Sequence, residues 1–591
     1  MRGILTISLM YVSILLNAAT YYVAPTTHPT TPGSDSRTAA QAQNIATPWA
    51  TWQKAINSVV AGDTIYLRGG TWYPTTYVGG SGCLVYIGRL YSSNANGTRA
   101  DPICMFAYPP DYEAGNPPIL DGSYATPQSG WMNGIGLEEI QYWKLKGLVV
   151  QNLKQELPSG SSMAVGMSSN NCANLYFENC VVRNISGRGN WCTSGAWNAY
   201  DGSGAYFASD TTRWINCDAY DICDTLSANP GNAGDGWKCH NYEYNLFYWE
   251  NCRAWYYSDD GFDPSGSGAR EFRGCWAMAS SKYAEFDIEG NGFKTAGTSV
   301  PVTPDLPNQN RARFYNCIAV NCPSKGFYNN LEAGSTGDPR SSNPIYYNNS
   351  TYLCETGYAD VYSTTGIISR NNIAYAHTSD TYTQTQIYGT TYTCSNNTWL
   401  STVDWPGWEL NPAYSVTNAD FISLDYMQLF AARKSDGSKP DVTFMRLADG
   451  SDLIDGGYDV GLTYNGSAPD LGAWEYGTYE TSSATDILTF TLPVQTGEAI
   501  INAITHTVAI EVAYTADVTN LTPTITLSYG ATINPLSGVS QNFTSPVTYT
   551  VTALDGTTTQ EWVVTVAQEE EPPSPTGSSR IVKYRGLILK L

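Results

Sequence analysis

The chain has 591 residues, 53 of them acidic and 31 basic, with a formal net charge of −22. This charge argues against nucleic acid or an anionic membrane surface as a nonspecific partner, and the length predicts an elongated domain with at least one smaller module. The four scattered histidines disfavour a histidine-based triad or a zinc site, so a metal is expected to bind through oxygen.

The first 19 residues have the pattern of a secretory signal peptide. Arg2 precedes an apolar run over residues 4–16, and the small residues Ala18 and Ala19 follow it. The run is too short to span a membrane, and no later stretch is apolar enough to do so. We therefore predict a protein without a membrane span, secreted to the cell surface or beyond.

Residues 49–59 predict a short amphipathic helix. Trp49, Trp52, Ala55, Ile56 and Val59 recur at helical spacing on one face. A stack of strands needs a cover over its open end, and we expect this helix to supply it.

Between residues 144 and 376 a short strand motif recurs. The clearest copies are LYFENCVV (175–182), RWINCDAY (213–220), YWENCRAW (248–255), EFRGCWAM (271–278) and RFYNCIAV (313–320). Counted from Leu148, the equivalent position returns every 23 to 42 residues and continues at Asn349 and Asn372. Short strands at this spacing, with Gly, Asn and Ser turns between them, predict one coil of a parallel β-helix per repeat. The fold class is therefore all-β, with the stack finishing near residues 467–477.

The recurring cysteines predict an internal column and not a disulfide framework. Fourteen cysteines in an exported protein would ordinarily suggest disulfides. Stacked coils, however, place like side chains above like. We predict buried, unbridged thiols at Cys180, Cys217, Cys252, Cys275 and Cys317. Pairing among the other cysteines stays open.

An acidic cluster lies in the same part of the chain. Asp235 occurs in AGDGWKCH, and Asp259, Asp260 and Asp263 occur in SDDGFD. Loops on adjacent coils lie about 5 Å apart, so four carboxylates can converge, and a divalent cation would relieve their repulsion. Ca²⁺ takes 6 to 8 such oxygens. The alternative is a plain turn with Asx hydrogen bonds, and no EF-hand pattern is present.

Lys294, in GNGFKTAG, lies one coil beyond the acidic cluster. Most lysines are simply solvated, and that alternative applies here. A lysine held near a divalent cation and partly removed from water gives up its proton more readily, which would make the neutral amine available as a base.

The C-terminal part has a different texture. After a Thr/Ser-rich linker at residues 478–485, alternating strands over residues 486–567 predict a small antiparallel β-sandwich. This module resembles immunoglobulin-like or cadherin-like repeats. Residues 568–591 are expected to form a linker and a terminal tail of unassigned purpose.

The motifs DGWKCH, NCRAWYYSDDGFD, FRGCWAM and GNGFKTAG resemble polysaccharide lyase family 9, the pectate-lyase-like right-handed β-helices. The resemblance covers most of residues 20–477 and implies a catalytic β-helix domain there. It implies that Asp235, Asp259, Asp260 and Asp263 bind a catalytic Ca²⁺ and that Lys294 removes the C5 proton of a uronate. Lys238 and His240 stay unassigned, because the family varies at those two positions.

The expected partner is an acidic plant cell-wall polysaccharide, pectin, cleaved by β-elimination at galacturonate. Homogalacturonan and the rhamnogalacturonan I backbone both fit this chemistry. Lys325 and Arg270 are candidate contacts to neighbouring uronates, with solvated surface charge as their alternative. We expect a monomer. A glycoside hydrolase using Asp259 and Asp260, or a non-catalytic Ca²⁺-stiffened glycan-binding adhesin, stays open as another function.

Overall fold

The chain divides into two compact units, Met1–Thr478 and Tyr479–Leu591, which are described separately here. The computed structural model describes residues 18–78, 81–89, 92–126, 131–154, 163–186, 194–200, 211–223, 231, 234–241, 246–266, 269–278, 282, 290–297, 312–330, 344–361, 365–377, 385–387, 391–398, 414, 416–477, 485–528, 531–553 and 557–569. The predicted signal peptide, linker and tail lie almost entirely outside these residues.

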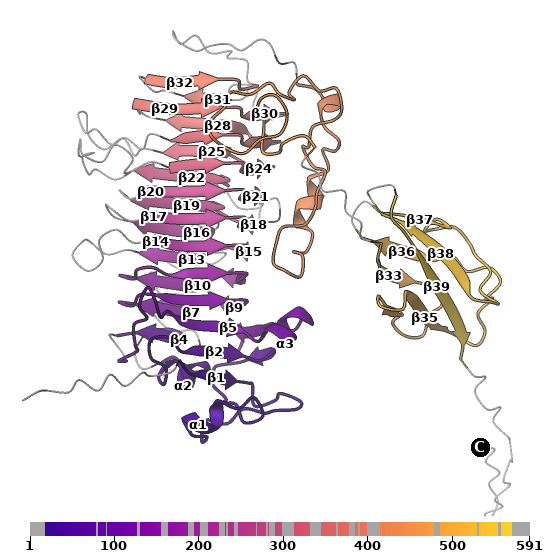
Figure 1. Ribbon diagram of the computed structural model, residues 1–591, viewed down its shortest axis with the longest axis horizontal. Coiled ribbons are helices and arrows are strands. Elements are labelled where there is room, and N and C mark those ends of the chain that lie inside the picture. The colour runs from indigo at the N-terminus through magenta and orange to yellow at the C-terminus, as the bar shows by residue number, and fades with distance from the viewer. Residues whose placement is uncertain are drawn as a thin grey trace, which may run out of the picture. The chain divides into compact units, whose positions relative to one another are not determined.

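The first unit is a parallel β-helix, as the repeat predicted, and its described strands form three long parallel sheets (Figure 1). From β2 to β31, each coil contributes one strand to sheet A, then one to sheet B, then one to sheet C.

Sheet A comprises β1 (Thr20–Val23), β2 (Thr64–Leu67), β5 (Ile103–Ala107), β8 (Trp143–Lys146), β11 (Tyr176–Glu178), β14 (Thr211–Ile215), β17 (Leu246–Glu250), β20 (Ala269–Arg273), β23 (Ala312–Tyr315), β26 (Ile345–Tyr347), β29 (Thr365–Arg370) and β32 (Thr391–Ser395). Sheet B comprises β3 (Gly70–Trp72), β6 (Pro118–Asp121), β9 (Val149–Lys154), β12 (Val181–Ser186), β15 (Asp218–Ile222), β18 (Arg253–Tyr257), β21 (Trp276–Met278), β24 (Ile318–Val320), β27 (Ser350–Tyr352) and β30 (Ile373–Tyr375). Sheet C comprises β4 (Cys83–Gly88), β7 (Trp131–Glu138), β10 (Met163–Asn170), β13 (Ser194–Tyr200), β16 (Gly234–Asn241), β19 (Phe262–Gly266), β22 (Phe293–Gly297), β25 (Lys325–Asn330), β28 (Thr356–Val361) and β31 (Thr385–Ile387).

The recurring Asn-Cys pair forms the turn between sheets A and B. The residue before each of the five column cysteines adopts left-handed backbone geometry. It is asparagine in four copies, with φ of 54° at Asn179 and 53° at both Asn216 and Asn251, and it is Gly274, with φ of 58°, in the other. Asparagine tolerates this region better than other residues with a side chain. The turn directs the following cysteine inward, so the pair marks one corner of the coils that carry it.

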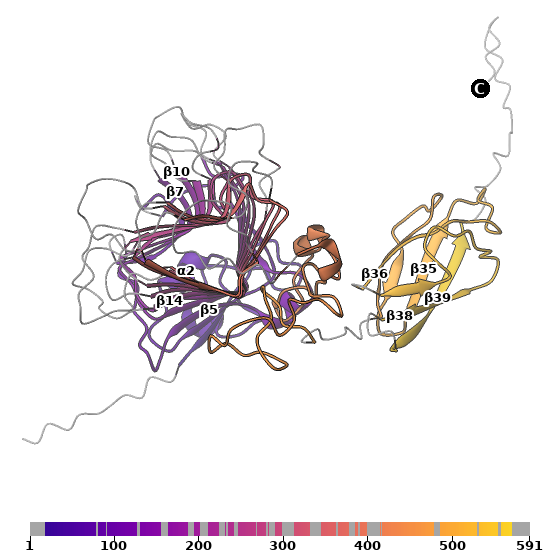
Figure 2. The same cartoon turned by 90° about the horizontal axis from the view of Figure 1, so that it is seen from above.

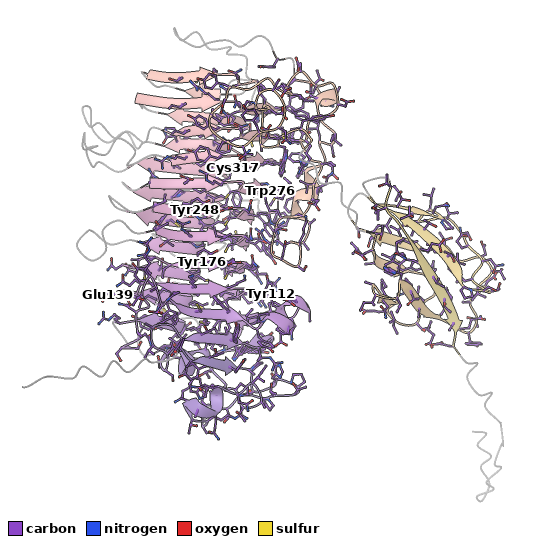
Figure 3. The ribbon with its side chains drawn as sticks, in the orientation of Figure 1. Tyr112, Glu139, Tyr176, Tyr248, Trp276 and Cys317 are labelled. Atoms are coloured by element: carbon purple, nitrogen blue, oxygen red, sulfur yellow. The ribbon has the colours of Figure 1, made fainter. Side chains whose placement is uncertain are left out.

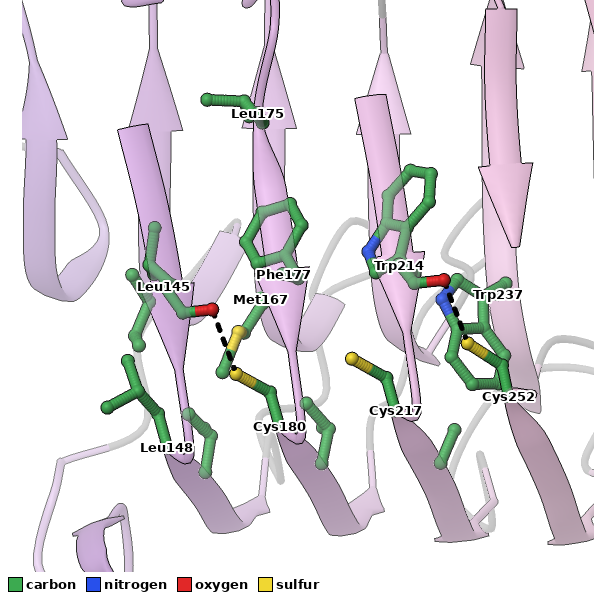
Figure 4. Close-up of a cluster of buried hydrophobic side chains, with 14 of the residues drawn as sticks. Leu145, Leu148, Met167, Leu175, Phe177, Cys180, Trp214, Cys217, Trp237 and Cys252 are labelled. Carbon is green, nitrogen blue, oxygen red and sulfur yellow. Dashed lines mark hydrogen bonds between the residues drawn. The ribbon is translucent and has the colours of Figure 1, made fainter. Parts of the chain in front are cut away.

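The predicted cysteine column is confirmed. All five of its thiols are free and fully buried. The close-up in Figure 4 shows Cys180, Cys217 and Cys252 in line, with Cys252 Sγ donating to the Trp214 carbonyl at 3.3 Å. The column continues in asparagines, where Asn372 Nδ2 lies 2.9 Å from Asn397 Oδ1. Buried amides are satisfied here because each donates to the next coil.

The predicted N-terminal helix is present, but it is shorter than the predicted range of residues 49–59. Helix α2 (Trp52–Ile56) buries Trp52, Ala55 and Ile56, and Thr51 caps it by accepting from the Lys54 backbone N–H at 3.2 Å. Figure 2 looks along the stack and shows α2 inside its three-sided cross-section. The other described α-helices of this unit, α1 (Ala39–Ala42) and α3 (Pro109–Glu113), are equally short.

The stack ends earlier than the sequence predicted. Its last described strand is β32, and residues 416–477 instead pack along the outside of sheet B. Phe421, Leu429 and Phe444 from this segment share one apolar cluster with Trp276 and Ile318 of sheet B. Two short 3₁₀ helices lie in it, η2 (Asn418–Asp420) and η3 (Tyr426–Phe430). The apolar outer face of sheet B explains the difference, since it requires a cover.

Sheet A shows the opposite behaviour, because its outer face is polar. Tyr176, Arg213 and Tyr248 stand in register on β11, β14 and β17. Figure 3 labels the two tyrosines on this face, and the Arg213 guanidinium lies 5.3 Å from the ring centre of Tyr248.

The second unit is a small, mostly antiparallel β-sandwich with its own core, which includes Phe490, Tyr549 and Trp562. One sheet pairs β33 (Ile487–Thr491) with β36 (Thr524–Leu527). The other comprises β34 (Ile500–Asn502), β35 (Thr507–Val512), β39 (Thr559–Gln568), β38 (Val547–Thr552) and β37 (Thr532–Asn534). One pair in it, β35 with β39, is parallel, which the prediction of a purely antiparallel sandwich did not include.

None of the helices in the described parts of the chain has the length and hydropathy needed to cross a membrane.

Candidate metal and catalytic site

A second repeat, x-Gly-aromatic, builds the corner at which strands of sheet C begin. Its copies are Asp235-Gly236-Trp237, Asp260-Gly261-Phe262, Asn291-Gly292-Phe293, Lys325-Gly326-Phe327 and Thr356-Gly357-Tyr358. A Cβ on Gly236 would lie 2.4 Å from the Gly261 carbonyl oxygen, and one on Gly261 would lie 2.7 Å from the Gly292 oxygen. The coils therefore approach too closely here for any other residue.

The aromatic member of each copy fixes the register. Trp237, Phe262, Phe293 and Phe327 stack inside the β-helix with ring centres 4.5, 4.8 and 4.8 Å apart. Interplanar angles of 4° to 6° show that the rings are parallel. Large stacked rings resist slippage between coils, so the residues on either side of them are held in two straight columns.

The first column, at the corner, contains Asp235, Asp260, Asn291 and Lys325. Each side-chain oxygen reaches the next coil. Asp235 Oδ1 accepts from the Asp260 backbone N–H at 3.3 Å, Asp260 Oδ1 accepts from Asn291 Nδ2 at 2.8 Å, and Asn291 Oδ1 accepts from the Lys325 N–H at 3.2 Å. Asp235, Asp260 and Asn291 are at most 1% exposed.

The second column lies two residues after each glycine and contains Lys238, Asp263, Lys294 and Tyr328. Lys238 pairs directly with Asp263, and Lys294 pairs directly with Tyr328. Lys238 forms an ion pair with Asp263, and its Nζ lies 3.9 Å from Asp235 Oδ2. The column thus alternates positive and negative charge over three coils.

Three of the four predicted metal ligands converge. Asp235, Asp260 and Asp263 each offer one carboxylate oxygen, and these oxygens lie within 4.8 Å of one another. Asp259 is buried beside them but is not a member of this group. Asp235 Oδ2 and Asp259 Oδ1 are buried without a hydrogen-bond partner among the described residues. A buried carboxylate oxygen without a donor is costly, so these atoms fit an oxygen-coordinated cation.

The pKa values of these carboxyls show the same conflict. Burial raises the pKa of Asp235 and Asp259 well above the ordinary value and also raises that of Asp260, and repulsion between the carboxylates adds to each. Asp263 differs. Burial would raise its pKa too, but the ammonium groups of Lys238 and Lys294 outweigh burial and hold it below the ordinary value. Positive charge is therefore needed for the whole cluster to be ionised.

Lys294 lies at the edge of the acidic cluster. Its Nζ is 3.0 Å from Asp260 Oδ2, and its side chain is 15% exposed, whereas that of Asp260 is fully buried. The amine is thus anchored by a carboxylate on the neighbouring coil while part of it reaches solvent. This is a suitable position for a group that exchanges protons with a bound ligand.

The two predicted substrate contacts have different surroundings. Lys325 is partly exposed, with its Nζ 2.9 Å from Ser324 Oγ and 4.8 Å from the ring centre of Tyr328. Arg270 is fully buried. It shares the inward face of β20 with Phe272, because alternate residues of a strand face the same side. Burial lowers the pKa of Arg270 to about 10. A side chain that is fully buried is also out of reach of a polysaccharide, which argues against the predicted contact.

Sequence reasoning missed Asn291 and left Lys238 without a role. Both would have been found by aligning the x-Gly-aromatic copies, because the residue before each glycine and the second residue after it fall into register. His240, which the sequence left unassigned, belongs to β16, and its side chain lies outside the described residues.

The comparisons with known proteins agree with this fold. Residues 29–372 match the family model described as "Pel9A-like, right handed beta helix region", and residues 487–566 match one described as "SGBP, N-terminal". Pectate lyase L of Dickeya dadantii is 28% identical over 464 residues, covering 77% of this chain and 90% of that protein. Pectate lyase PEL9 of Emericella nidulans is 23% identical over 461 residues, covering 74% and 94%.

Two solved structures share the fold. The crystal structure of pectate lyase Pel9A superimposes with a TM-score of 0.54 at 22% identity, covering 77% of this chain and 96% of that one. A structure titled "Rhamnogalacturonan lyase" gives 0.50 at 22% identity, covering 73% and 97%. The family model spans more than half of this chain, and its right-handed coil agrees with the three parallel sheets. The chain therefore belongs to the Pel9A-like right-handed β-helix family and is a polysaccharide lyase.

Proposed function

We propose that the protein is a secreted, Ca²⁺-dependent lyase that cleaves a galacturonate-containing pectic polymer, homogalacturonan, by β-elimination. The observation that carries this proposal is the convergence of three buried carboxylates beside a partly exposed lysine. The pectate lyases among its relatives support the substrate class.

The acidic cluster would hold the ion. Asp235, Asp260 and Asp263 supply the converging oxygens, and Asp259 adds a buried oxygen nearby. When bound, Ca²⁺ would supply Lewis-acid chemistry, withdrawing charge from the C6 carboxylate of a uronate and so acidifying the C5 hydrogen. An acidic protein can then bind an acidic polymer.

Lys294 is the proposed base. As a neutral amine, its Nζ takes the C5 proton, the C5–H electrons form the C4–C5 double bond, and the C4–O bond breaks. The leaving oxygen takes a proton from solvent, and no water is consumed overall. Asp260, 3.0 Å from Nζ, stabilises the ammonium that results. Lys325 lies two coils beyond Asp260 in the corner column, and in this proposal it would contact a neighbouring uronate.

A rhamnogalacturonan I lyase is the second candidate. The specific observation in its favour is the fold shared with the structure titled "Rhamnogalacturonan lyase". Both polymers present a galacturonate to the same groups, so the cluster fits either substrate.

The test is incubation of the full chain with polygalacturonate and with rhamnogalacturonan I, separately, with Ca²⁺ and with EDTA, at alkaline pH. We expect polygalacturonate to give a product whose unsaturated end absorbs ultraviolet light, and only when Ca²⁺ is present. The same product from rhamnogalacturonan I instead would favour the second candidate. A saturated product that forms equally in EDTA would indicate a glycoside hydrolase instead. Ca²⁺-dependent binding of the protein to either polymer without cleavage would indicate an adhesin.

The role of Lys294 is tested with Lys294→Met. General-base removal is expected to lower kcat by about 10²- to 10⁴-fold while Ca²⁺ still binds. Lys146→Met is the matched control, since Lys146 forms a half-exposed ion pair with Glu178 on sheet A. Full activity of Lys294→Met would refute the assignment.

A further inference from the structure

Lys238 lies against the acidic cluster. It is on β16, directly beside Asp263 of β19, and three residues after Asp235. Parallel strands place such neighbours about 4.8 Å apart, so the ammonium lies against two of the three carboxylates that converge. Lys294 pairs with the third, Asp260.

The ammonium and a bound cation would use the same oxygens. Lys238 forms its ion pair with Asp263 Oδ2, and its Nζ lies 3.9 Å from Asp235 Oδ2, for which the described part of the chain offers no hydrogen-bond partner. A Ca²⁺ ion contacts its ligand oxygens at 2.3–2.6 Å, and its charge repels an ammonium held on the same carboxylates. The lysine in this position therefore opposes binding of the ion, and moving it away favours binding.

Lys238 is also the member of this group that can leave. Its side chain is 32% exposed, whereas those of Asp235 and Asp263 are 0% and 4% exposed. The lysine has four rotatable bonds and a path to solvent, while the buried aspartates are fixed between coils.

We propose that Lys238 is a built-in counterion of the metal site, which holds the carboxylates of Asp263 and Asp235 together in the empty protein and competes with Ca²⁺ for them. This rests on the proposed function only in taking Ca²⁺ as the ion. The four aspartates and two lysines of the cluster carry a formal charge of −2, so removal of one lysine leaves −3 and a stronger attraction for a dication.

The experiment is calorimetric titration of Ca²⁺ into the EDTA-treated full chain at pH 7.5, for the native protein, Lys238→Met, Lys238→Arg and the control Lys146→Met. We expect Lys238→Met to bind Ca²⁺ at least tenfold more tightly, and Lys238→Arg and the control to bind no more tightly than the native chain. The melting temperature of Lys238→Met should fall in EDTA and be restored by Ca²⁺. Restoration by Ca²⁺ also shows that the variant folds.

Unchanged or weaker Ca²⁺ binding by Lys238→Met would overturn the inference, as would equal tightening by Lys146→Met. The two proposals fail separately. If neither polymer is cleaved but Lys238→Met still binds Ca²⁺ more tightly, the lyase activity is refuted and the counterion role stands. If cleavage is Ca²⁺-dependent and the affinity of Lys238→Met is unchanged, only the counterion role is refuted.

Discussion

Asp218 holds the segment that covers sheet B, and replacing it tests how that cover is anchored. Its carboxylate accepts from Arg253 Nε at 3.0 Å and Nη2 at 2.8 Å, and from Arg433 Nε at 3.0 Å and Nη2 at 2.6 Å. The three side chains are 2% to 10% exposed. Asp218→Asn would leave two buried guanidinium groups without their counter-charge.

The expected loss of stability follows from these contacts. Breaking a buried ion pair costs about 3–5 kcal/mol. Both arginines keep hydrogen bonds to backbone carbonyls, including Ala431 O at 2.8 Å from Arg253 and Asn251 O at 2.8 Å from Arg433. Because these bonds offset part of the loss, we expect Asp218→Asn to lower the free energy of unfolding at pH 7 by about 3 kcal/mol.

The pH dependence has a definite sign. Burial would raise the pKa of Asp218, but Arg253 and Arg433 outweigh burial and lower it below the ordinary value of 3.8. The ionised carboxylate therefore stabilises the folded chain fully above about pH 4, and this contribution is lost as pH falls through the lowered pKa. Native protein and variant should approach equal stability in strong acid.

Urea unfolding followed by tryptophan fluorescence measures the effect, since 16 of the 17 tryptophans precede residue 479. The control is Asp441→Asn, which breaks an exposed ion pair with Lys434 and is expected to cost less than about 1 kcal/mol. A loss below about 1 kcal/mol for Asp218→Asn at pH 7, or a loss independent of pH, would refute the reasoning.

Three further predictions concern other buried groups. Asn372→Leu should destabilise the chain by about 2–3 kcal/mol in the same urea assay, because the buried backbone N–H and Nδ2 of Asn349 lose their shared acceptor, Asn372 Oδ1. Burial and Asp470 raise the pKa of Glu475 to about 7, so the free energy of unfolding should fall as pH rises from about 4.5 to 7. Glu475→Gln should remove about 1–2 kcal/mol of this pH dependence. A difference in stability between native protein and variant that does not change with pH would contradict the prediction. Burial raises the pKa of Cys252, so its thiol should react with a disulfide reagent only after unfolding.

The sequence by itself determined the coil repeat and the interior of the β-helix. Each Asn-Cys pair encodes a left-handed turn and an inward side chain, and both are local properties that a single segment carries. The inward face of Arg270 was equally readable, since it lies two residues before Phe272, although the charge alone suggested a surface role. The acidic run in SDDGFD likewise pointed to the candidate site from the sequence alone.

Only the tertiary structure decided which charges meet. Asp235 and Asp260 are 25 residues apart, and the register set by the stacked rings of Trp237 and Phe262 brings their oxygens together. The same register puts Lys238 against Asp263, a pairing that the sequence shows only when the x-Gly-aromatic copies of different coils are aligned. The sequence did not predict the cover over sheet B for the same reason, because the apolar residues of segment 416–477 pack against a face assembled from several coils. Contacts between distant segments depend on how the coils align, and alignment is a property of the whole stack.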